Sequence, residues 1–78
     1  MNLDMELLKS IPVNDETRKE ISDYIAKAYE NDKESMGKLV MFYNHCAEGL
    51  MSLGETGAMS AARILLERAQ YWMSEYEK

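Results

Sequence analysis

The stretch from residue 36 to residue 53 limits the fold more than any other part of the chain. Six of its residues are spaced alternately three and four apart, which places them on one stripe of an α-helix: Met36, Leu39, Tyr43, Cys46, Leu50 and Leu53. The same stretch contains five consecutive apolar residues, 39–43. Successive helical residues are rotated by about 100°, so this run reaches every side of the helix. The helix must therefore be central, or its second face must contact another chain.

Four amphipathic segments at helical spacing, and no segment typical of a strand, predict an all-α fold. The expected helices lie at 3–10, 15–31, 34–53 and 57–76. Pro12 separates the first two, because the residue before a proline is driven out of the α region. A short loop beginning at Gly54, which suits a left-handed backbone, makes the last two helices antiparallel neighbours. We expect one domain over 1–78, with a short N-terminal helix or arm followed by a three-helix antiparallel bundle.

The helix termini carry recognisable signals. Asp4 and Glu6 lie in the first turn of the first helix, where the helix dipole favours acids. The apolar stripe of that helix is expected to be Leu3, Leu7, Leu8 and Ile11. Asn14 is a good N-cap for the second helix, and Arg18 belongs to its charged face, opposite the apolar stripe. Several N-caps are plausible for the last two helices: Asn31, Asp32 or Ser35 for the third, and Thr56 or Ser60 for the fourth.

The apolar stripes of the last two helices predict the core. The fourth helix repeats the alternating spacing with Ala58, Ala62, Leu65, Ala69, Trp72 and Tyr76. Where the two stripes face each other, we expect a packed core of Leu39, Tyr43, Leu50, Leu65, Ala69 and Trp72.

These helices carry more apolar surface than one chain of this length covers. A chain of 78 residues buries only about 60% of the surface that its unfolded form exposes. We therefore expect a homo-oligomer, first of all a symmetric dimer through the third or fourth helix. Methionine adapts to irregular partner surfaces, and aromatic side chains with a polar group are enriched at interfaces. The residues assigned to a partner or oligomer interface are Met41, Phe42, Met51, Met59, Tyr71 and Met73.

Charge and cysteine content narrow the function classes. The net charge of −5 argues against direct nucleic-acid binding, which needs clustered lysine and arginine. The single cysteine, Cys46, excludes an intramolecular disulfide and suits a reducing cytoplasm. The acidic N-terminus is unlike a signal peptide, and no apolar run approaches the ~20 residues that span a bilayer. We expect a cytoplasmic protein that does not bind membranes.

The chain contains few residues that could bind a metal ion or take part in catalysis. His45 and Cys46 are adjacent on a helix, so their side chains diverge and cannot hold one metal ion together. The same divergence argues against a cysteine–histidine nucleophile pair. We predict no metal, no cofactor and no enzymatic activity.

Two functions are compatible with these observations. The main hypothesis is an interaction protein that regulates or inhibits a larger protein. Because small acidic helical chains are frequent on phages and other mobile elements, an inhibitor of a host protein is the specific expectation. The alternative is a helical oligomer that binds or sequesters a nucleotide-sized ligand, with the Gly54–Gly57 loop at a helix N-terminus offering N–H groups to an anion. The ligand-binding residues would be Lys38, Tyr43, Arg63 and Arg68.

Overall fold

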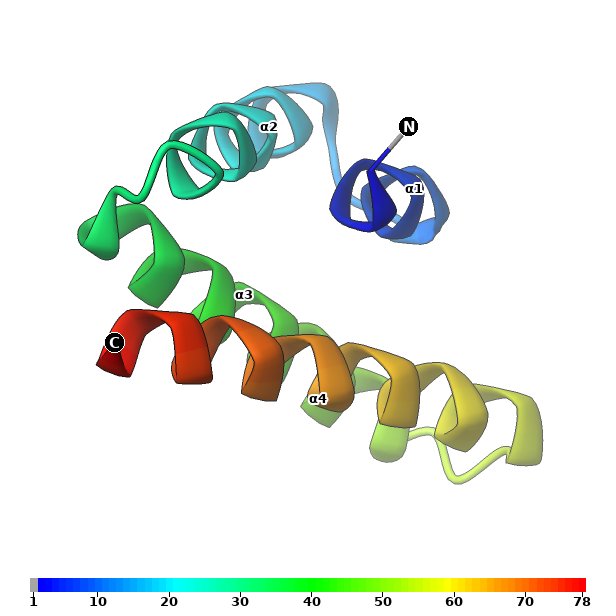
Figure 1. Cartoon of the computed structure of the whole chain (residues 1–78). Coiled ribbons are helices and arrows are strands. Elements are labelled where there is room, and N and C mark those ends of the chain that lie inside the picture. The colour runs from blue at the N-terminus through cyan, green and yellow to red at the C-terminus, as the bar shows by residue number, and fades with distance from the viewer. Residues whose placement is uncertain (1) are drawn as a thin grey trace.

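The computed structural model describes residues 2–78 and shows four helices. They are α1 (Leu3–Ser10), α2 (Asp15–Ala28), α3 (Lys33–Met51) and α4 (Thr56–Glu77). The described residues contain no strand, which confirms the all-α class. α3 and α4 lie side by side and antiparallel, α2 packs on α3, and α1 packs on α2 (Figure 1).

Side-chain caps start the first three helices. Asn14 accepts a hydrogen bond from the Thr17 N–H at 2.8 Å, which confirms it as the N-cap of α2. Asp32 caps α3 by accepting from the Ser35 N–H at 3.1 Å, so the choice among three candidates falls on Asp32. Asn2 caps α1 in the same way. Each cap satisfies one of the N–H groups that a helix start leaves without a partner.

The turns differ from the prediction in three places. α3 ends at Met51 instead of Leu53, which is 62% exposed. α2 ends at Ala28 instead of Asn31, and Asn31 has a φ of 68° in the left-handed region, which stops the helix. α4 begins at Thr56 without a side-chain hydrogen bond at its N-cap, so neither Thr56 nor Ser60 is the cap. Gly54 has a φ of 70°, the left-handed backbone predicted for it.

The core lies where α3 and α4 face each other and is covered by α2 and α1. Of the predicted core residues, five are buried: Leu39, Tyr43, Leu65, Ala69 and Trp72. Leu50 is half-buried and packs at the edge of this cluster. The N-terminal half adds Leu8, Ile11, Ile21 and Ile25 to the core.

Arg18 fastens the turn between α1 and α2. Its guanidinium donates hydrogen bonds to the carbonyl oxygens of Leu8 at 2.6 Å, Ile11 at 3.2 Å and Val13 at 3.2 Å. The first of these carbonyl oxygens lies in the last turn of α1 and also accepts a hydrogen bond from the Ile11 N–H at 3.2 Å. Placing Arg18 on the solvated, charged face of α2 is therefore wrong, because α1 folds back and presents its carbonyl end to this side chain.

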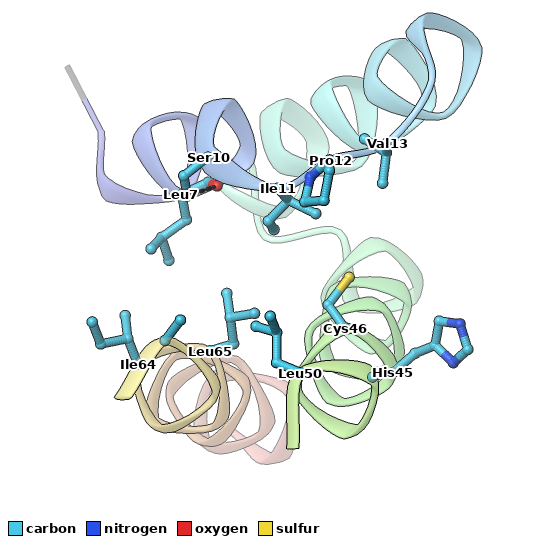
Figure 2. A pocket seen from close by; sticks show the side chains of 12 residues that line it. Leu7, Ser10, Ile11, Pro12, Val13, His45, Cys46, Leu50, Ile64 and Leu65 are labelled. Atoms are coloured by element: carbon cyan, nitrogen blue, oxygen red, sulfur yellow. Dashed lines mark hydrogen bonds between the residues drawn. The ribbon is translucent and has the colours of Figure 1, made fainter. Parts of the chain in front are cut away.

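The connection from α1 to α2 does not close fully on the α3–α4 pair. Leu7 and Ile11 lie on one side of a cleft of about 490 Å³, and Leu50 and Leu65 lie on the other (Figure 2). Leu50 is only half-buried because it lines this cleft.

Candidate functional site

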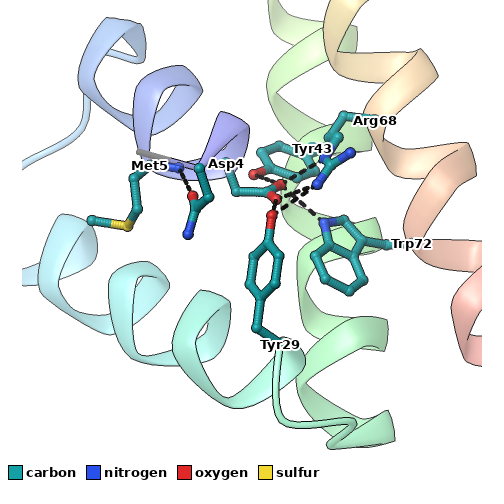
Figure 3. A network of polar contacts seen from close by, with 7 residues as sticks. Asp4, Met5, Tyr29, Tyr43, Arg68 and Trp72 are labelled. Atoms are coloured by element: carbon teal, nitrogen blue, oxygen red, sulfur yellow. Dashed lines mark hydrogen bonds and ion pairs between the residues drawn. The ribbon is translucent and has the colours of Figure 1, made fainter.

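The carboxylate of Asp4 lies fully buried where all four helices meet (Figure 3). Its Oδ1 accepts hydrogen bonds from the Tyr43 hydroxyl at 2.6 Å, Arg68 Nε at 3.0 Å and Trp72 Nε1 at 2.9 Å. Its Oδ2 accepts from the Tyr29 hydroxyl at 2.7 Å and Arg68 Nη2 at 2.6 Å. One acid on α1 is thus bound to α3, to α4 and to the residue that ends α2.

The protonation states in this network are fixed around neutral pH. Burial raises the pKa of Asp4, but the hydrogen bonds from Arg68, Trp72 and the two tyrosines outweigh it and hold the pKa below its ordinary value of 3.8. Burial, followed by the hydrogen bond to Asp4, raises the pKa of Tyr29 to about 12 and raises that of Tyr43 as well. The charge of Arg68 balances that of Asp4. The network therefore fastens α1 to the bundle and does not exchange protons near neutral pH.

The sequence predicts Asp4 only as an acid in a first turn, and its burial is a correction to that prediction. The available signal was its spacing, because Asp4, Leu8 and Ile11 are four and three residues apart and share one stripe. Leu3 was expected on the apolar stripe, but it is 52% exposed, and Asp4 takes the inner position. Asp4 can occupy that position because its partners supply enough hydrogen bonds to replace water.

The residues predicted to bind a nucleotide-sized ligand do not surround an open site. Tyr43 and Arg68 are brought together, but both donate to Asp4, which occupies the position that a ligand anion would take. Lys38 and Arg63 are exposed on α3 and α4. Arg68 itself is half-buried and lies 4.0 Å from the centre of the Tyr71 ring, stacked against it.

The two residues considered for metal binding or catalysis diverge, as expected from their adjacency. Cys46 is half-buried at the cleft, and burial raises the pKa of its thiol, so the thiol is neutral at pH 7. His45 also borders the cleft, but its exposed ring points away from the space (Figure 2). Within residues 2–78, no three His, Cys, Asp or Glu side chains lie close enough to hold a metal ion.

The residues predicted for an interface lie mainly on the surface of α3 and α4. Five are exposed, namely Met41, Met51, Met59, Tyr71 and Met73, whereas Phe42 is partly buried against the core. Met41 and Met73 line one groove, whereas Tyr71 packs edge-on against Trp72 and is stacked by Arg68.

Met41 and Met73 belong to an apolar groove, hereafter the outer groove, between the start of α3 and the end of α4. Its volume is about 390 Å³. The residues that line it are Glu34, Gly37, Lys38, Val40, Met41, Met73 and Tyr76. Met41 is 69% exposed, the highest value among the large hydrophobic residues of the described chain. Glu34 and Lys38 add one charge of each sign to the groove.

None of the helices within residues 2–78 combines the length and the hydropathy needed to cross a bilayer. Comparison of the chain with protein-family models, curated proteins and solved structures gave no significant match.

Proposed function

We propose that this chain is a small interaction module that regulates or inhibits a larger protein in the cytoplasm by binding it through the outer groove. The observation that carries the proposal is the exposure of Met41 beside Met73 and Tyr76. Large apolar side chains left in water forfeit about 25 cal/mol per Å² of apolar area, so a partner that covers them gains that free energy. Methionine fits irregular partners, and tyrosine supplies an apolar ring with a polar end.

The surroundings of the groove support recognition of a protein surface. Protein interfaces combine an apolar centre with a polar rim, and here Glu34 and Lys38 supply charges beside Met41. The groove lies on two helices whose inner faces are packed in the core, so its walls are held in place before binding. Such a module works by occupying a surface and needs no reaction chemistry.

The proposal includes a homodimer that forms through the same groove when the larger partner is absent. A two-fold axis would bring the groove against itself and set Glu34 of one copy near Lys38 of the other. The dimer would complete the bundle by covering the apolar surface that α1 and α2 leave open.

Met41→Glu tests this function, with Met59→Glu as the matched control. Met59 is also an exposed methionine, 47% exposed on α4, but it does not line the groove. Immobilised parent chain and both variants are incubated with lysate of the native cell, and the bound proteins are quantified by mass spectrometry. We expect Met41→Glu to lose the specific partner and to sediment as a monomer, with Met59→Glu behaving like the parent. Identical binding by all three chains would refute a role for the groove.

A further inference from the structure

The cleft between the α1–α2 connection and the α3–α4 pair is a second concave site, separate from the outer groove. Leu7, Ile11 and Val13 form one wall, and Cys46, Leu50 and Ile64 belong to the other (Figure 2). Its volume of about 490 Å³ falls within the range of about 300–1,000 Å³ that is usual for small-ligand sites. No aspartate, glutamate, lysine or arginine lines it.

Polar contacts at both ends of α1 act together with the packing of Leu8 and Ile11 in the core to set the position of the α1 wall. The Asp4 network fastens the start of α1 to α3 and α4, and Arg18 fastens its end to α2. Between these two attachments, Leu7 and Ile64 point toward each other without filling the space, and Ile64 is 50% exposed (Figure 2). The apolar atoms that face this open cleft contact water, and an apolar molecule between them would remove that surface from water.

We propose that this cleft binds a neutral, mostly apolar small molecule, of the size of a few fused rings or a medium-length acyl chain. A charged ligand would lose its hydration without gaining a counter-charge, because the lining has no aspartate, glutamate, lysine or arginine and the ring of its one histidine, His45, points away from the space (Figure 2). The Ser10 hydroxyl already donates to the Leu7 carbonyl oxygen at 2.8 Å, and the Cys46 thiol is neutral. Walls formed on both sides by one chain suit a small molecule, whereas a protein partner needs a broader surface.

The neutral dye Nile red serves as the probe, because its fluorescence rises in apolar surroundings. With the parent chain we expect saturable binding at one site per chain and a higher melting temperature in the presence of the dye. Bound dye should also slow the alkylation of Cys46 by N-ethylmaleimide, since the thiol lies at the wall of the cleft.

Gly49→Leu places a leucine side chain at the wall of the cleft. Gly49 lines the cleft, and a Cβ atom built there meets no heavy atom within 4 Å. Its backbone is helical, and leucine is a better helix former than glycine, so the variant should fold. Gly57→Leu is the matched control, because a Cβ atom there also meets nothing within 4 Å and Gly57 lies outside the cleft.

The expected result is at least a tenfold loss of Nile red affinity in Gly49→Leu and parent-like affinity in Gly57→Leu. Unchanged affinity in Gly49→Leu would overturn the proposal. So would loss of the signal in Met41→Glu instead, because the dye would then be bound in the outer groove. A third contrary result concerns dilution of the chain while the dye is held at a fixed concentration above its dissociation constant. If the fraction of chains with bound dye then falls, the site lies between two copies.

Discussion

Asp4→Asn keeps the size of the side chain but removes the negative charge that five hydrogen bonds surround. The amide can still accept hydrogen bonds at its oxygen. Its NH₂ group, however, must face donors: either the Tyr29 hydroxyl and Arg68 Nη2, or the Tyr43 hydroxyl, Arg68 Nε and Trp72 Nε1. The substitution also leaves Arg68 without its counter-charge.

Removing one partner of a buried ion pair costs about 3–5 kcal/mol. The side chain of Arg68 is 14% exposed and can recover some hydration, so we expect the lower end, about 3 kcal/mol. A chain of 78 residues has a total stability of about 4–12 kcal/mol at the usual free energy per residue. This single substitution therefore removes between a quarter and most of the folding free energy.

Urea unfolding, followed by circular dichroism and by the fluorescence of Trp72, measures the loss. The chain has one tryptophan, and it donates to Asp4 directly, so its emission reports on the network. Glu6→Gln is the control, because it removes the same charge from an exposed position in the first turn of α1. Weaker interaction with the helix dipole should cost that variant only about 0.3–1 kcal/mol. If Asp4→Asn and Glu6→Gln are equally stable, the hydrogen bonds of Asp4 do not fasten α1 to the bundle.

Three further perturbations follow from the same structure. Because the pKa of Asp4 is lowered in the folded state, the stabilisation that its carboxylate provides is complete above about pH 4 and is lost as the pH falls through the pKa of the folded state. Asp4→Asn should therefore make the urea midpoint less dependent on pH in the acid range. An unchanged pH profile in this variant would contradict the role of Asp4. Leu65→Ala should cost about 2–5 kcal/mol, and Leu50→Ala less because Leu50 is half-buried; calorimetry giving the reverse order would refute this packing. Arg18→Lys should cost about 1–3 kcal/mol, since an ammonium group lacks the planar guanidinium geometry that reaches three carbonyl oxygens. A melting temperature like that of the parent chain would show that these three hydrogen bonds do not stabilise the turn.

Local signals in the sequence determine the helices of this protein. The spacing of apolar residues predicts four helices because a helical face repeats every three to four residues, and residues 2–78 form four. Asn14 and Gly54 act as predicted because capping and left-handed backbone depend on the residue itself and its immediate neighbours. The stripes of α3 and α4 likewise identify Leu39, Leu65 and Trp72 as core, because antiparallel neighbours joined by a short loop must bury the faces they share.

The tertiary structure decided which charged side chains are buried and which partners they contact. Asp4 is buried because donors at positions 29, 43, 68 and 72 converge on it, and no local pattern reports that convergence. Arg18 leaves the solvated face because α1 folds back and offers it three carbonyl groups. The cleft likewise depends on tertiary packing, because its lining comes from α1, the α1–α2 connection, α3 and α4. A charged side chain can be buried only where distant residues replace its water, and those distances are set when the helices pack.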